Sequence, residues 1–171
     1  MDMNSPKTLF KGKFLQVELI RGKYEIVRRP PAVGALIYWC SQQKIVLVKH
    51  KRPGVEECIW EIVAGIVEQN EELVSAVERE VMEEVGLTVK SIVFLGSFYP
   101  TPGYSDEVIY LFFVEADNSE LKKNDTSEEL EPFALKIEDV WKLEHKDMKT
   151  LLSLYLSKDK GLLKTMNSGS F

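Results

Sequence analysis

The sequence contains little cysteine and no long apolar run. Its two cysteines, Cys40 and Cys58, form neither a CxxC pair nor a zinc-ligand spacing. We expect both to be buried, reduced thiols, as in a cytosolic protein. Apolar runs such as ALIYWC are far too short to cross a bilayer, and the opening MDMNSPKTLFKGKF lacks the apolar segment of a secretory signal. These absences predict a cytoplasmic protein that does not enter a membrane.

An excess of positive charge is also missing. The chain carries 27 acidic and 22 basic residues, which gives a net charge of −5. We therefore do not expect broad attraction to nucleic acid or to an anionic membrane. If the substrate is an anion, a positive group must be brought to it, and a metal ion is the obvious candidate. The length of 171 residues and the hydrophobic share of 44% are enough for one folded domain with a core.

The spacing of apolar residues predicts strands followed by a helix, then strands and a helical end. Strands are expected at 14–20, 23–29, 32–40, 44–50, 91–99 and 108–116. Residues 71–85 have helical spacing, and Gly86 follows where a helix C-terminal glycine belongs. Residues 137–160 predict one broken helix or two short helices. This order predicts an α/β or α+β sandwich with a mixed sheet.

The predicted helix carries Glu80, Glu83 and Glu84 within one turn. Like charges at this spacing repel one another and normally weaken a helix. Glu80 and Glu84 border the apolar stripe that should face the sheet, where unpaired carboxylates are costly. That stripe consists of Val74, Val77, Val81 and Val85. One explanation is a charged surface helix in which Glu83 pairs with Arg79. We favour the other, a set of hard oxygen ligands for Mg²⁺ or a similar ion.

The stretch from Gly65 to Leu87 resembles the Nudix box, G-x5-E-x7-R-E-U-x-E-E-x-G-U, where U is a bulky aliphatic residue. All nine constrained positions match: Gly65, Glu71, Arg79, Glu80, Val81, Glu83, Glu84, Gly86 and Leu87. The resemblance implies a Nudix-type α/β/α sandwich over most of the chain, with additional antiparallel strands at its N-terminus. It also implies hydrolysis of a nucleoside diphosphate linked to another group, with two or three Mg²⁺ or Mn²⁺ ions.

Two further features resemble one branch of this family, the ADP-ribose pyrophosphatases and nucleoside-diphosphate-sugar hydrolases. Pro102 lies fifteen residues after Leu87, and KHKRPGVEECIWEIVAG matches the strand, arginine and E-x-x-A-G arrangement of that branch. The implied reaction converts ADP-ribose to AMP and ribose 5-phosphate. One alternative is another nucleotide sugar, such as GDP-mannose. An alternative of another class is a nucleotide-sensing module without turnover.

The resemblance assigns metal-binding roles position by position. Glu80 and Glu84 would bind the metals, with Glu83 as a ligand or close support, and the backbone carbonyl of Ala64 would be a further ligand. Arg79 would anchor the catalytic helix by pairing with a glutamate, for which Glu71 is the candidate.

Other roles fall on the loops. Arg52 would contact the diphosphate, Pro102 marks the substrate loop, Glu107 would contact the sugar or a metal-bound water, and Tyr104 is a stacking or packing group. Among Glu128, Glu129 and Glu131, we favour Glu128 as general base and metal ligand. The resemblance further implies a homodimer in which N-terminal strands, residues 1–33, contact the partner of the Nudix domain at 34–171.

Overall fold

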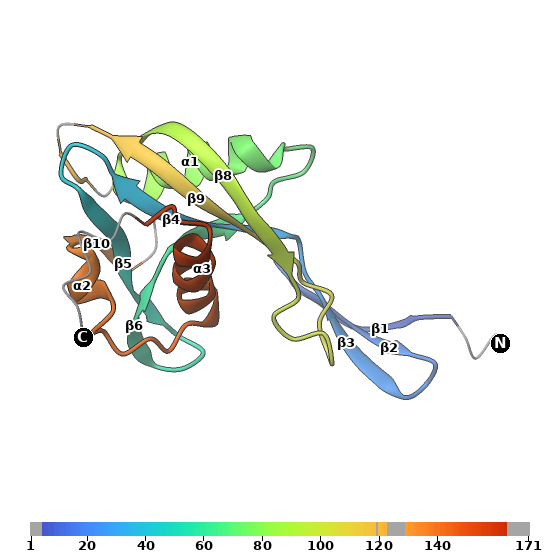
Figure 1. Cartoon of the computed structure of the whole chain (residues 1–171). Helices are drawn as coiled ribbons and strands as arrows, with labels where there is room; N and C mark the ends of the chain where they lie inside the picture. Colours follow the sequence, from blue (N-terminus) through green and yellow to red (C-terminus); the bar gives the residue numbers. More distant parts are fainter. Residues whose placement is uncertain (1–4, 119, 123–128, 164–171) are drawn as a thin grey trace.

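The structure is a computed structural model that describes residues 5–118, 120–122 and 129–163. A mixed sheet lies between helices on its two faces, and a separate three-stranded sheet extends from one end (Figure 1). The predicted α/β/α arrangement with additional N-terminal antiparallel strands is therefore confirmed. No helix within the described residues is long and apolar enough to span a membrane.

The central sheet has seven strands in the order β10-β5-β4-β9-β8, with β6 beside β5 and β7 beside β4. The strands are β4 (Ala32–Trp39), β5 (Lys44–Arg52), β6 (Glu57–Glu61), β7 (Val63–Ile66), β8 (Thr88–Phe98), β9 (Ile109–Asp117) and β10 (Leu130–Leu135). Strands β4 and β9 run parallel, and the other pairs are antiparallel. The sheet is thus mixed, as predicted.

Alternate residues of the central strands pack against opposite layers. On β4, Val33 and Ile37 belong to the apolar cluster that includes helix α1 (Leu73–Val85), whereas Leu36 belongs to the other cluster. That second cluster includes Val140 of the short helix α2 (Ile137–Val140) and Leu154 of α3 (Met148–Asp159). Both faces of the sheet are therefore covered.

Helix α1 ends as predicted but differs at its start and in its buried stripe. Gly86 has a left-handed conformation, with φ of 70°, and donates its N–H to the Met82 carbonyl, which explains why glycine suits this helix end. The helix begins at Leu73, two residues later than predicted. The prediction that Val74 faces the sheet was wrong, because Val74 is 49% exposed. Ala76 is buried instead, so the buried stripe is rotated toward the glutamates.

The N-terminal sheet contains β1 (Lys7–Lys11), β2 (Gln16–Ile20) and β3 (Tyr24–Arg28). It projects away from the central sheet (Figure 1) and is joined to the loop after β8. Val27 donates its N–H to the Tyr104 carbonyl at 2.7 Å, and Arg28 pairs with Asp106 at 3.1 Å. These bonds fix the base of the projecting sheet beside the loop that contains Pro102.

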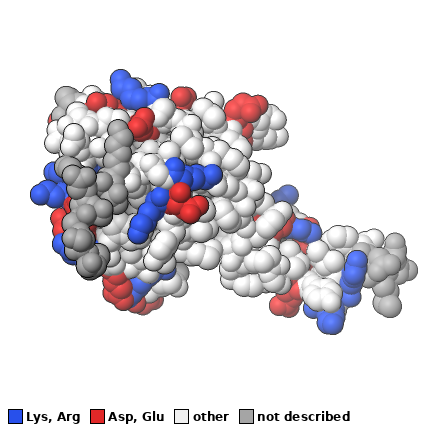
Figure 2. Space-filling model, viewed as in Figure 1, with Lys and Arg blue, Asp and Glu red and all other residues white. Residues whose placement is uncertain are grey.

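Several short strands were not predicted. Strands β1, β6, β7 and β10 have only four to six residues each. In addition, β10 pairs with β5, which is distant from it in the sequence. The prediction of two buried thiols was also wrong, because Cys58 is exposed and Cys40 is only half-buried; both are free. On the face shown in Figure 2, Lys and Arg side chains of the described residues lie among Asp and Glu and form no broad basic patch.

Candidate active site

A cleft of about 1000 Å³ opens beside helix α1, and most of the residues singled out in the sequence line it. The predicted residues in its lining are Arg52, Ala64, Arg79, Glu80, Glu83, Glu84 and Glu107. They come from four separate segments of the chain: β5, β7, α1 and the loop before β9. The fold therefore brings four of the five predicted metal ligands and the predicted diphosphate contact into one site.

The cleft is shaped by a change of pairing partner at Ile62. Strand β6 pairs with β5, whereas β7, which begins one residue after Ile62, pairs with β4. The Ile62 N–H donates to the Thr150 hydroxyl of α3 at 2.8 Å, and Thr150 is fully buried. This bond satisfies a backbone donor at the point where the strand changes partner. As a result, Glu61 and Ala64 are held on either side of the change and both line the cleft.

The carboxylate of Glu80 lies directly against the backbone of β7. A methyl group built at Gly65 would overlap all three atoms of that carboxylate, so only glycine permits this approach. Glu80 is 9% exposed and Glu84 is 5% exposed, which is unusual for glutamates. The nearly buried carboxylate of Glu80 therefore lies against the backbone beside Ala64.

Arg79 joins the helix to the preceding loop. Its guanidinium donates to Glu71 at 2.8 and 3.0 Å, to Glu80 at 2.7 Å, to Glu83 at 3.3 Å and to the Ile66 carbonyl at 3.0 Å. The hydrogen bond to Glu71 raises the pKa of Arg79, and the same bond lowers the pKa of Glu71 to about 2. The predicted pairings of Arg79 with Glu71 and Glu83 are both present.

The donor atoms in the cleft fit a divalent cation in chemical type. The carboxylates of Glu80, Glu83 and Glu84 are hard oxygen donors, and the backbone carbonyl of Ala64, another lining residue, is a donor of the same kind. In the described part of the chain, no three His, Cys, Asp or Glu side chains already form a metal-binding group. Arg79 holds the carboxylates of Glu80 and Glu83, so binding a cation there requires exchange of these hydrogen bonds.

A second ionic network forms another part of the cleft wall. Arg52 donates through Nε and Nη2 to Glu61 at 2.7 and 2.8 Å, and Lys149 of α3 donates to Glu61 and, at 2.9 Å, to Asp147. Glu61 is 1% exposed. Burial opposes its ionisation, but the hydrogen bond from Arg52 and the charge of Lys149 outweigh this effect and lower the pKa of Glu61 to about 2.

Sequence reasoning missed Lys149, Asp147 and Arg29 as cleft residues. Lys149 lies 88 residues after Glu61, and nothing in the local sequence indicates that contact. Arg29 ion-pairs with Glu107 at 3.2 Å at the base of β3. The sequence identified Glu61 only as the first residue of the E-x-x-A-G pattern and predicted no role for it.

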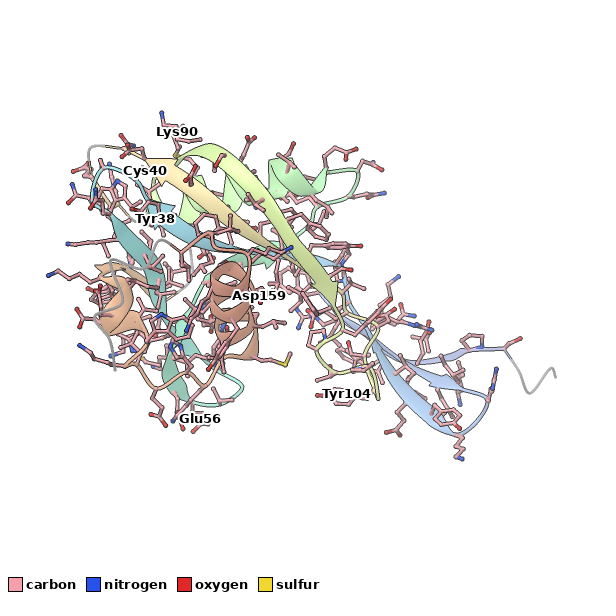
Figure 3. The ribbon with its side chains drawn as sticks, viewed as in Figure 1. Tyr38, Cys40, Glu56, Lys90, Tyr104 and Asp159 are labelled. Atoms are coloured by element: carbon pink, nitrogen blue, oxygen red, sulfur yellow. The ribbon has the colours of Figure 1, made fainter. Side chains whose placement is uncertain are left out.

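The remaining predicted residues lie elsewhere. Pro102 and Tyr104, both described, are not in the lining of the cleft. Tyr104 is 56% exposed and projects from the loop beside β3 (Figure 3). Trp60 contacts Phe133 edge to face and packs against the core. The candidate general base, Glu128, lies outside the described residues.

Comparison with known proteins agrees with this geometry. A sequence profile described as the NUDIX domain matches residues 28–155. The chain is 36% identical over 145 residues to an ADP-ribose pyrophosphatase of Bacillus subtilis (strain 168), covering 79% of this chain and 78% of the relative. It is 26% identical over 159 residues to a GDP-mannose pyrophosphatase of Cronobacter sakazakii (strain ATCC BAA-894), covering 85% and 83%.

A solved structure described as an ADP compounds hydrolase superposes with a TM-score of 0.74 over 92% of each chain. At 18% identity, that likeness supports the fold alone. The profile covers most of the chain, and the Bacillus relative shares more than a third of the aligned residues. The chain therefore belongs to the NUDIX domain family.

Proposed function

We propose that this protein hydrolyses the diphosphate bond of ADP-ribose, releasing AMP and ribose 5-phosphate, with the help of divalent cations. The observation that carries the proposal is the convergence of Glu80, Glu84 and Ala64 in one cleft, in a chain with 36% identity to an ADP-ribose pyrophosphatase. The described lining holds seven acidic and four basic side chains. A diphosphate would be repelled by such a wall unless cations were bound to it.

Each part of the cleft has a role in this reaction. Glu80 and Glu84, with the Ala64 carbonyl and with Glu83 in support, would hold Mg²⁺ or Mn²⁺; when bound, the cation would neutralise the diphosphate and acidify a water. Arg79 holds the helix against the Gly65 loop and keeps these donors in place. Arg52 would bind a diphosphate oxygen. We expect two or three ions, which a Mn²⁺ titration of the protein with a hydrolysis-resistant substrate analogue would count.

Contacts outside the metal wall remain predictions. Glu107, held by Arg29, would contact the sugar or a water, and Glu128 would serve as general base and further metal ligand. Pro102 and Tyr104 would meet substrate only if their loop contributes to a site outside the cleft of its own chain. Kinetics of Glu128→Gln, which should lower kcat more than it changes KM, would test the base assignment.

The reaction is tested with Glu80→Gln and Glu84→Gln. Each should keep its fold, as measured by circular dichroism, while turnover of ADP-ribose with Mg²⁺ falls by several orders of magnitude, since an amide binds the cation far more weakly than a carboxylate. Glu78→Gln, an exposed glutamate on the same helix, is the matched control and should retain full activity. Wild-type turnover in a folded double Gln variant would contradict the proposal.

GDP-mannose is the second candidate substrate, because the chain also resembles a GDP-mannose pyrophosphatase over 85% of its length. Release of products from ADP-ribose, GDP-mannose, FAD and NADH should be compared in one Mg²⁺ buffer. We expect the highest kcat/KM with ADP-ribose. A higher value with GDP-mannose would change the substrate but not the reaction, whereas tight binding without hydrolysis would indicate a nucleotide sensor.

We also propose that the protein is a homodimer in the cytoplasm. The projecting sheet carries exposed apolar side chains, among them Leu9, Phe10, Phe14 and Tyr24, and a small sheet needs a covering surface to be stable. A second copy would supply that cover and bring Tyr104 and Pro102 near its cleft. Sedimentation should show a dimer that Phe10→Asp weakens. A fully active monomer would exclude this arrangement.

A further inference from the structure

Lys149 occupies an unusual position for a lysine. It lies in the first turn of α3, directly after the N-cap Asp147 and Met148. A helix N-terminus carries partial positive charge, so a cation there is disfavoured and acidic residues are preferred. Its side chain is nevertheless only 13% exposed and lines the cleft. Because Lys149 departs from the charge preference of a helix N-terminus and lines the cleft, a functional reason for this residue is indicated.

Lys149 and its ionic partners form a charge-balanced group on the cleft wall, two cations with two carboxylates. Lys149 and Arg52 share the buried carboxylate of Glu61. Asp147 pairs with Lys149, but its other oxygen accepts from the Thr150 N–H at 2.9 Å and so also faces the helix N-terminus. The other cations of the described lining differ: Arg29 pairs with Glu107, and Arg79 faces three glutamates. Beside Glu61, by contrast, two cations of the lining lie on one carboxylate, so a phosphate bound there would meet both.

A purely structural role for Lys149 would be to neutralise Glu61. Arg52 already does so, because it donates two hydrogen bonds to that carboxylate. Lysine also has three N–H donors, and Glu61 and Asp147 account for two of them.

We propose that Lys149 is a substrate-binding residue, the second cation of a subsite that holds one phosphate of the nucleoside diphosphate, with Glu61 as its positioning residue. This inference rests on the proposed diphosphate hydrolysis and adds a residue of α3 to it. Lys149 would donate to an oxygen of the phosphate that Arg52 contacts. Lys149 would act in substrate binding, so its substitution should change KM and Kd rather than kcat.

Two substitutions with opposite expected signs test the proposal. Lys149→Met removes the cation and should weaken binding roughly tenfold to a hundredfold, the value of a charge-assisted hydrogen bond. Asp147→Asn removes a negative charge from the same wall while keeping a good N-cap residue, and it should tighten binding. If Lys149 merely neutralised Glu61, Lys149→Met would leave the affinity unchanged. Lys149→Arg should remain close to wild type in Kd.

Affinity is measured by calorimetry with the hydrolysis-resistant α,β-methylene analogue of ADP-ribose in Mg²⁺ buffer, and KM and kcat are measured with ADP-ribose. Lys158→Met, an exposed lysine of the same helix, is the matched control for charge and should leave Kd unchanged. Thermal melts verify that each variant folds. If Lys149→Met does not fold, Lys149→Gln, which keeps a polar side chain without the charge, is measured in its place.

The outcomes separate this inference from the proposed function. Weaker binding by Lys149→Met together with tighter binding by Asp147→Asn supports the subsite. An unchanged Kd in folded Lys149→Met, or an unchanged or weaker affinity in folded Asp147→Asn, overturns it while the hydrolase assignment stands. A wild-type protein that neither binds the analogue nor hydrolyses ADP-ribose overturns the proposed function, and the subsite with it.

Discussion

Gly65 is the position at which one added methyl group tests the geometry of the cleft. A Cβ atom there would overlap the carboxylate of Glu80, and that carboxylate accepts from Arg79 at 2.7 Å. In Gly65→Ala, either Glu80 rotates away and loses the Arg79 bond, or the β7 backbone moves. Loss of a hydrogen bond to a charged group costs about 1.5–3 kcal/mol. Overpacking that shifts backbone costs about 1–3 kcal/mol.

Either response should lower both the stability of the protein and its turnover of ADP-ribose. The free energy of unfolding, measured with urea, should fall by about 1–3 kcal/mol. Turnover of ADP-ribose should fall about a hundredfold or more, because a displacement of about 1 Å at a reacting centre has effects of that size. Gly103→Ala is the matched control, since a Cβ atom there has no neighbour within 4 Å.

A double-mutant cycle assigns the cause. In a Glu80→Ala background, the carboxylate that Gly65→Ala would strike is absent, so the added methyl group should cost little stability. The difference between the two backgrounds is the coupling energy between positions 65 and 80. If Gly65→Ala matches wild type in both urea midpoint and turnover, Glu80 does not approach the β7 backbone and the geometry described for the cleft is wrong.

Three further predictions concern the residues that hold the cleft. The pKa of Glu61 is lowered from 4.5 to about 2, so its ionised form stabilises the fold above pH 4.5. This contribution, about 3 kcal/mol, is lost as the pH falls toward 2. In acid unfolding, the stability difference between wild type and Glu61→Gln should therefore shrink across that window. Thr150→Val leaves the buried Ile62 N–H without its acceptor and should lower the free energy of unfolding by about 1–3 kcal/mol in urea, whereas Thr150→Ser should restore it. Arg79→Lys keeps the charge but cannot reach all the acceptors of the guanidinium, and it should reduce kcat with little change in the circular dichroism spectrum.

Local spacing predicted the parts of the site that belong to one segment. The glutamates of α1, the end of that helix at Gly86 and the pairing of Arg79 with Glu71 all lie within 23 residues, and the structure confirms the pairing and the helix end. Helical periodicity also placed Glu80 and Glu84 at the border of the core. The periodicity wrongly predicted that Val74 is buried. A helical wheel assigns the buried face from apolar residues alone, and here Glu80 and Glu84 are part of that face.

Contacts between distant segments could not be predicted from the sequence. Strands β6 and β7 are two short segments of one extended stretch, and only their partners β5 and β4 make them separate strands. Lys149 reaches Glu61 because α3 packs beside the strand change at Ile62, where Thr150 accepts its N–H. Such contacts follow from tertiary packing, and neither residue type nor spacing indicates them.

The structure also changes the explanation for the clustered glutamates of α1. The sequence suggested that a bound cation would relieve their repulsion, but Arg79 already donates to Glu80 and Glu83 from within the chain. Repulsion along the helix is therefore reduced before any cation binds, which allows the helix to fold with two nearly buried carboxylates. A cation must then compete with Arg79 for these oxygens. The affinity of the site for metal should consequently depend on Glu71, because this residue offers Arg79 an alternative partner that lies outside the cleft lining. Glu71→Gln would weaken that alternative, keep Arg79 on Glu80, and raise the Mg²⁺ concentration needed for half-maximal activity without a matching change in the KM for ADP-ribose.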